Sequence, residues 1–205
     1  MNQPNTPTDE LIFATGNPNK VREAKVLLQD YMQVKSKKDI GCLEELPETN
    51  PTLEANAIQK ARYLADNYGV HCFSEDTGLE IDALAGEPGV YSARYAGLER
   101  DANKNMDLVL SKMQGIEDRG AQFRTIIALI LHGKTYTFEG IVRGQIAQGK
   151  SGSEGFGYDP IFIPEGAQKT FAAMSTASKN QVSHRARALA KLVDFLQSYY
   201  QNQAS

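Results

Sequence analysis

The chain has 205 residues, with 22 Lys+Arg against 25 Asp+Glu, a formal net charge of −3, and 41% hydrophobic residues. This apolar content with little net charge excludes a disordered chain, and the length suits one domain or two small lobes. The near-balanced charge also excludes a protein that coats nucleic acid, because such proteins carry a strong basic excess. A polyanionic partner would need a local cluster of cations or a metal ion.

The two ends of the chain and its cysteines predict a cytoplasmic protein. Residues 1–10 lack a basic segment followed by an apolar one, so we predict a flexible tail and no secretory signal. The longest apolar run, Ile126–Leu131, is far too short to span a membrane. Cys42 and Cys72 form no CxxC motif and fit two reduced thiols. The polar residues 201–205 predict a frayed end.

The first half of the chain predicts a strand, a turn and two helices. Residues 11–14 form a short apolar run that ends at a Gly- and Pro-containing turn, residues 15–18. A helix is expected next, because apolar residues recur at a spacing near 3.6, at Val21, Ala24, Leu27, Leu28 and Tyr31. A second helix is predicted from Thr52 to Tyr68, with Gly69 as its stop.

The second half predicts strands and two more helices. A buried strand over 70–73 is expected to end in an acidic turn, residues 74–78, and residues 86–89 form a loop. A third helix carries apolar residues at Met106, Val109, Leu110 and Met113. Strands are predicted over 123–131, 135–138 and 141–146, and the last helix begins near Ser183. Strands that alternate with helices predict an α/β protein with a mixed sheet.

The turn at Thr15–Lys20 is a candidate phosphate site. Its glycine permits close approach to a ligand, and the N-terminus of the next helix is expected to offer free N–H groups. Lys20 adds a full positive charge. The turn is not a Walker A loop, because the GxxxxGK[ST] pattern is absent. An ordinary junction between a strand and a helix has the same pattern.

Acidic residues form a candidate metal site. Glu75 and Asp76 follow a buried strand, where two carboxylates are costly without a cation or hydrogen bonds. Such oxygen ligands suit Mg²⁺, which takes one or two carboxylates together with substrate phosphates. Glu44, Glu45 and Glu48 form a further acidic patch in a loop. A turn and a loop that face water are the simpler interpretations.

Two later segments are candidates for binding an aromatic ligand. Phe156–Pro160 places two aromatic residues around a glycine and before an aspartate, which suits stacking on a base. Lys179, His184 and Arg185 precede or begin the last helix, where the helix dipole disfavours cations, so a ligand that needs them is indicated. Core aromatic residues and plain surface charge are the alternatives.

Together these segments resemble the inosine triphosphate pyrophosphatases, the non-canonical purine nucleoside triphosphate pyrophosphatases. The resemblance rests on TGNPNK at 15–20, EDTGLEIDAL at 75–84, GEPGVYSARYAG at 86–97, GFGYDPIF at 155–162 and SHRARAL at 183–189. It implies a two-lobed mixed-sheet α/β fold with a nucleotide cleft between the lobes, usually a homodimer. Residues 11–200 would form this single catalytic domain. It further implies Mg²⁺-dependent hydrolysis of ITP, dITP and XTP to the monophosphate and pyrophosphate, without nucleic acid or membrane as partner.

The resemblance also implies roles for individual residues. Asp76 would be the general base and a metal ligand, and Glu48 the other metal ligand. The substrate would be bound by Thr15, Gly16, Asn17, Pro18, Asn19, Lys20, Thr77, Phe156, Gly157, Tyr158, Asp159, Lys179, His184 and Arg185. The acidic turn departs from many bacterial relatives, which have two aspartates and a serine there. How Glu75 shares the metal with Asp76, and whether Glu45 replaces Glu48, therefore stay open.

The expected chemistry is attack of water on the α-phosphorus, with the pyrophosphate leaving. Selectivity is expected from donors at the C6 oxygen of hypoxanthine or xanthine, with His184 and Arg185 as candidates. The way in which guanine is rejected, and the order of preference among ITP, dITP and XTP, are not given by the sequence. A pyrophosphatase for pyrimidine or modified nucleotides and a nucleotide sensor without turnover are the alternatives.

Overall fold

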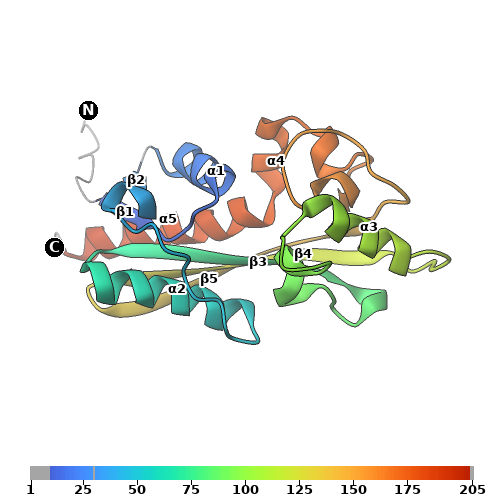
Figure 1. Cartoon of the computed structure of the whole chain (residues 1–205). Coiled ribbons are helices and arrows are strands. Elements are labelled where there is room, and N and C mark those ends of the chain that lie inside the picture. Colours follow the sequence, from blue (N-terminus) through green and yellow to red (C-terminus); the bar gives the residue numbers. More distant parts are fainter. Residues whose placement is uncertain (1–9, 30, 204–205) are drawn as a thin grey trace, which may run out of the picture. The chain divides into compact units, whose positions relative to one another are not determined.

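The computed structural model describes residues 10–29 and 31–203 and contains one mixed sheet with the strand order β2-β1-β3-β4-β5-β6 (Figure 1). The strands are β1 Glu10–Phe13, β2 Gln33–Ser36, β3 Cys72–Ile81, β4 Gly120–Leu131, β5 Lys134–Ile146 and β6 Phe162–Pro164. The α-helices are α1 Pro18–Leu28, α2 Leu53–Tyr68, α3 Ala102–Lys112, α4 Thr176–Val182 and α5 His184–Gln203. The predicted α/β class is confirmed.

The chain divides into two compact units. The first consists of Met1–Asp76, Ile126–Glu139 and Ala188–Ser205, and the second of Thr77–Thr125 and Gly140–Arg187. The nucleotide cleft expected between two lobes stays a prediction. Residues 1–9 of the predicted tail lie outside the described residues, whereas Glu10 already belongs to β1. The helix α5 continues to Gln203, residues 204–205 lie outside the described residues, and the frayed end expected over 201–205 stays a prediction.

In the first unit, helices pack on both sides of the strands. β1 pairs in parallel with β2 and with β3, as expected for a strand-helix-strand connection. Side chains of α1 and α5 share a core cluster with buried residues such as Phe13, Phe73 and Ile127. Figure 1 shows α1 on one side of β3 and α2 on the other. The contacts of α2 agree, because the Cys72 thiol and the Ser74 hydroxyl donate to its carbonyl groups.

The predicted acidic turn at residues 74–78 is wrong, because β3 runs through it without a break. Side chains alternate along a strand, so Phe73 and Glu75 lie on the side of α1, while Cys72, Ser74 and Asp76 lie on the side of α2. The carboxylates tolerate a buried strand because a lysine compensates each of them: Lys20 lies 3.1 Å from Glu75 and Lys60 lies 3.1 Å from Asp76.

Other predicted boundaries also change. The strands expected over 135–138 and 141–146 form the single strand β5, because Gly140 is accommodated within it. Tyr31 lies beyond α1, which ends at Leu28, and is 37% exposed. The short elements β2, β6 and α4 were not predicted, because each has too few residues for a periodic pattern. The second helix was predicted well: Thr52 caps it and Gly69 ends it in the left-handed conformation.

The second unit has a core of its own. Apolar residues of β3, α3, β4 and β5 join aromatic residues of the segment after β5, notably Tyr158, Phe162 and Phe171. The buried Asn105 of α3 ties down the preceding segment, because it accepts from the Ala96 N–H at 2.7 Å and donates to the Ala93 carbonyl at 3.1 Å. The region around Phe156 and Asp159 is therefore supported by a packed interior.

In the part of the chain that the structure describes, no helix is both long and apolar enough to cross a membrane. Cys42 and Cys72 are free thiols, in agreement with the prediction, and both are fully buried.

We expect both thiols to resist modification in the folded protein. Burial raises the pKa of the Cys72 thiol to about 12, so the reactive thiolate is scarce at neutral pH. Labelling with a disulfide reagent such as DTNB should be slow in buffer and should reach both thiols rapidly only in denaturant. Rapid labelling of either cysteine in buffer would contradict this burial.

Candidate active site

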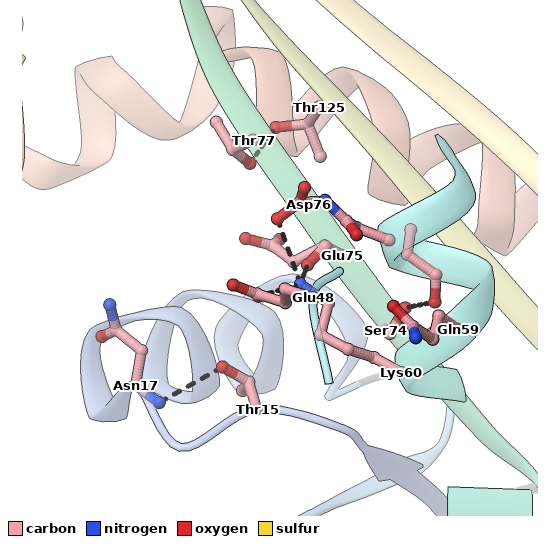
Figure 2. A network of polar contacts seen from close by, with 12 residues as sticks. Thr15, Asn17, Glu48, Gln59, Lys60, Ser74, Glu75, Asp76, Thr77 and Thr125 are labelled. Carbon is pink, nitrogen blue, oxygen red and sulfur yellow. Dashed lines mark hydrogen bonds and ion pairs between the residues drawn. The ribbon is translucent and has the colours of Figure 1, made fainter. Parts of the chain in front are cut away.

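Two carboxylates of the first unit converge on one lysine. The Lys60 ammonium of α2 lies 2.6 Å from Glu48 Oε1 and 3.1 Å from Asp76 Oδ1, and it donates to the Glu75 carbonyl at 2.8 Å (Figure 2). Its side chain is 6% exposed, against 13% for Asp76 and 26% for Glu48. We call Glu48, Lys60, Glu75 and Asp76 the carboxylate–lysine cluster. Three of its oxygen atoms, Glu48 Oε1, Asp76 Oδ1 and the Glu75 carbonyl oxygen, surround the Lys60 ammonium.

Burial and charge shift the pKa values in this cluster. Burial raises the pKa of the Asp76 carboxyl, and the positive charges of Lys60 and Lys20 only partly offset this effect. Burial alone would lower the pKa of Lys60, but the carboxylates of Asp76 and Glu48 outweigh burial and raise it. A carboxylate with a raised pKa in a partly dry setting is suited to accept a proton.

The two adjacent acids have different partners. Asp76 lies with Lys60 and Glu48, whereas the Glu75 carboxylate, 1% exposed, lies 3.1 Å from the Lys20 ammonium. The alternation of side chains along β3 causes this separation. The geometry places Asp76 with Glu48 at Lys60 and Glu75 with the lysine of α1, whereas the sharing of a metal between Glu75 and Asp76 stays a prediction.

The three glutamates of the loop before α2 also have different surroundings. Glu48 lies at Lys60, whereas Glu45 is exposed. Glu44 accepts hydrogen bonds from the hydroxyls of Tyr63, at 3.3 Å, and Tyr68, at 2.8 Å. This geometry favours Glu48 over Glu45 as a ligand for a cation.

The turn at residues 15–20 differs from the expectation in one respect. The Asn17 side chain caps α1, because its Oδ1 accepts from the N–H groups of Asn19 at 2.9 Å and Lys20 at 3.4 Å. The Asn17 N–H donates to the Thr15 hydroxyl at 3.2 Å. Pro18 has no N–H, so the expected free N–H groups in this first turn are not found. Attraction for an anion rests instead on the Lys20 charge and the helix dipole.

A second cluster lies in the second unit. The Lys179 ammonium of α4 lies 2.8 Å from the Asp159 carboxylate, and both side chains are at most 5% exposed. The same carboxylate oxygen accepts from the Phe156 N–H at 2.8 Å. Gly155, at φ 77°, permits this approach, because a Cβ there would overlap the Asp159 carboxylate. Asp159 thus holds both Lys179 and the Phe156 backbone.

Two cations lie over the ring of Phe156. The Lys179 ammonium is 5.0 Å and the Arg185 guanidinium carbon 5.3 Å from its centroid. His184 stacks on Phe123, with centroids 4.5 Å apart. Because Arg185 is 2% and His184 3% exposed, the alternative that they are plain surface charge is wrong. We call Phe156, Asp159, Lys179, His184 and Arg185 the aromatic–cation cluster.

Besides the turn at residues 15–20, three predicted residues lie outside these clusters. Tyr158 packs in the core of the second unit, where its hydroxyl donates to the Ser92 carbonyl at 2.8 Å. Gly157 adopts φ 65° beside it, a conformation that favours glycine. The Thr77 hydroxyl lies 2.6 Å from the Thr125 hydroxyl, within hydrogen-bond distance (Figure 2).

Sequence reasoning missed Lys60. Leu53, Ala57, Ala61 and Leu64 of α2 are buried, and Lys60 lies on the same face. A lysine in an apolar stripe predicts a buried cation that needs carboxylate partners, and this signal was available.

Comparison with known proteins agrees with the geometry. The model of the Ham1 family matches residues 11–195. The chain belongs to the Ham1 family. The resemblance inferred from the five motifs is confirmed.

Relatives of this Ham1 family member carry specific names. This chain is 49% identical over 187 residues to the dITP/XTP pyrophosphatase of Flavobacterium johnsoniae, and the match covers 91% of this chain and 97% of the relative. It is 47% identical over 193 residues to the Bacillus subtilis protein of the same name, covering 92% and 98%. The Ham1 protein structure from Staphylococcus aureus matches with a TM-score of 0.85 at 39% identity, covering 93% of this chain and all of that one.

Proposed function

We propose that this chain hydrolyses dITP, ITP and XTP to the nucleoside monophosphate and pyrophosphate, which removes non-canonical purines from the nucleotide pool. The observation that supports this most directly is the convergence of the Glu48 and Asp76 carboxylates on the Lys60 ammonium. A nucleotide sensor without turnover would not need this pair of acids. The names of the relatives support the substrate class, since they are dITP/XTP pyrophosphatases.

The first unit is assigned the triphosphate and the reaction. Asp76 orients the attacking water and takes its proton as oxygen attacks the α-phosphorus and the bond to the pyrophosphate oxygen breaks. Its raised pKa favours this role. Lys60 offsets the repulsion between Asp76 and Glu48 and keeps both carboxylates in place. Thr15–Lys20 contact the phosphates, with Lys20 as the charged group. Thr77, which follows Asp76 in β3 and begins the second unit, is also assigned a substrate contact.

Mg²⁺ is the proposed cofactor, held by Glu48 and Asp76. The donor set fits, because Mg²⁺ takes one or two carboxylates with substrate phosphates and waters, and three oxygens already surround the Lys60 ammonium. The described residues contain no group of three acidic, His or Cys side chains that could hold a metal, so the substrate would complete the coordination. When bound, Mg²⁺ supplies charge stabilisation for the phosphoryl oxygens.

The second unit is assigned the purine. The partly exposed ring of Phe156 suits stacking on the base, with Arg185 and His184 as donors to its C6 oxygen. Asp159 orients Lys179 toward the substrate through their buried ion pair. Gly157 and Tyr158 shape this loop. We further propose, from the family resemblance, a homodimer in the cytoplasm.

The test is pyrophosphate release by the full chain across ITP, dITP, XTP, ATP, GTP and pyrimidine triphosphates, with and without Mg²⁺. We expect kcat/KM for ITP or XTP to exceed that for ATP and GTP by about 100-fold or more, because an unmatched polar group in a binding pocket costs a few kcal/mol. Chelation of the metal should abolish turnover. Equal rates with GTP, or the same activity after chelation, would contradict the proposal.

A further inference from the structure

The loop that carries Glu48 has no regular secondary structure of its own. It extends from Gly41 to Thr52, between a short 3₁₀ helix that ends at Ile40 and the start of α2. A loop of this kind is ordinarily mobile, and a mobile carboxylate is a poor ligand because its ordering opposes binding. Some contact must therefore hold Glu48 at Lys60.

The Gln59 side chain of α2 makes such a contact. Its Oε1 accepts from the Thr49 N–H at 3.0 Å and from the Asn50 side-chain amide at 2.8 Å, and its Nε2 donates to the Thr49 hydroxyl at 2.9 Å. One amide thus makes three hydrogen bonds to the two residues that follow Glu48. Figure 2 shows Gln59 on α2 next to Lys60, which lies against the Glu48 carboxylate.

Asn56, one helical turn earlier, extends the same contact. Its Oδ1 accepts from the Asn50 N–H at 2.8 Å, and its amide donates to the Asn50 carbonyl at 3.2 Å. Asn56 is 1% exposed, and its two hydrogen bonds to the half-buried Asn50 are partly shielded from water. Positions 56, 59 and 60 share one face of a helix. This face therefore binds residues 48, 49 and 50 in succession.

We propose that Gln59 is a positioning residue that holds the Glu48 carboxylate ready to share a divalent cation with Asp76. The proposal rests on the proposed function. Gln59 acts through the Thr49 N–H and hydroxyl and the Asn50 side-chain amide, and it is not itself assigned a contact with metal or substrate. Gln59 orders Glu48 before the cation binds. The entropic cost of ordering the Glu48 side chain then does not reduce the affinity for the cation. Removal of such supporting hydrogen bonds costs about 10–100-fold in metal affinity.

Three variants of the full chain separate positioning from general stability. Gln59→Ala removes all three hydrogen bonds. Gln59→Glu keeps both acceptor contacts, and the Thr49 hydroxyl can turn to donate to the second carboxylate oxygen. Asn67→Ala is the matched control, because Asn67 is also on α2 and its amide donates to the helix's own Tyr63 carbonyl.

The readouts are the Kd for Mn²⁺, used as the probe for Mg²⁺ and measured by electron paramagnetic resonance, and urea unfolding of each variant. We expect Gln59→Ala to bind Mn²⁺ about 10-fold more weakly, Gln59→Glu to recover most of that loss, and Asn67→Ala to match the wild type. In turnover, the Mg²⁺ concentration for half-maximal rate should rise by a similar factor in Gln59→Ala, with kcat at saturating Mg²⁺ nearly unchanged.

A double-variant cycle tests the route through Glu48. In a Glu48→Gln background, Gln59→Ala should have no further effect on Mn²⁺ affinity, because the carboxylate that it positions is absent. An unchanged Kd in Gln59→Ala, an undiminished effect in that background, or the absence of Mn²⁺ binding by the wild type would overturn the inference. A different result tests the proposed function: that function is wrong if the wild type releases no pyrophosphate from ITP or XTP.

Discussion

Asp76→Asn should lower kcat for ITP hydrolysis by about 10²–10⁴-fold, the usual contribution of a general base. The substitution keeps the shape of the side chain but leaves an amide that cannot accept the proton of water. It also removes one of the two carboxylates that converge on the Lys60 ammonium, the pair proposed to hold Mg²⁺. The measurement is pyrophosphate release at saturating ITP over a range of Mg²⁺ concentrations.

Asp66→Asn is the control for Asp76→Asn, because Asp66 is an exposed aspartate on α2 and lies outside the carboxylate–lysine cluster. It should retain the wild-type rate. Near-normal turnover of Asp76→Asn would remove Asp76 from the role of base. Recovery of the rate at high Mg²⁺ alone would leave it only as a metal ligand.

Lys60→Met should lower the free energy of unfolding by about 3 kcal/mol at neutral pH in the absence of divalent cations. The reason is that removal of one partner from a buried ion pair leaves uncompensated charge, here on Asp76 and Glu48. Added Mg²⁺ should restore part of the loss, since a cation that binds the folded state stabilises it. Urea unfolding with and without Mg²⁺ measures both effects.

Two further variants test the origin of this effect. Lys104→Met breaks an exposed pair with Glu99, whose side chains are 59% and 57% exposed, and should cost less than about 1 kcal/mol. Lys60→Met combined with Asp76→Asn should be more stable than Lys60→Met alone, because a buried charge has been removed with its partner. If Lys60→Met were as stable as Lys104→Met, the cluster would not depend on its lysine.

The predicted elements were accurate where periodicity or capping is strong. Thr52 and Gly69 marked the ends of α2. The last helix was expected to begin near Ser183, and the Ser183 hydroxyl accepts from the Ala186 N–H of α5 at 3.2 Å. The prediction failed at residues 74–78, because two acids and a glycine have the composition of a turn. The partners that keep them in a strand, Lys20 and Lys60, are distant in sequence.

Tertiary contacts also explain the residues that were overlooked. Gln59 and Asn56 look like ordinary polar positions of a helix, and only the return of the loop at Thr49 and Asn50 gives them partners. Tyr158 was expected to line a base pocket with Phe156, yet it packs in the core. A tyrosine next to a glycine carries no signal of which way its ring points.

The sequence by itself determined the family, the α/β class and the segments that carry the candidate site, because motifs and helix periodicity are local properties of the chain. The family model confirms this over residues 11–195. Only the tertiary structure decided that Asp76 and Glu48 share the Lys60 ammonium while Glu75 pairs with Lys20. The reason is that burial and charge pairing depend on which elements pack together, and the alternation along β3 sends neighbouring side chains to opposite faces.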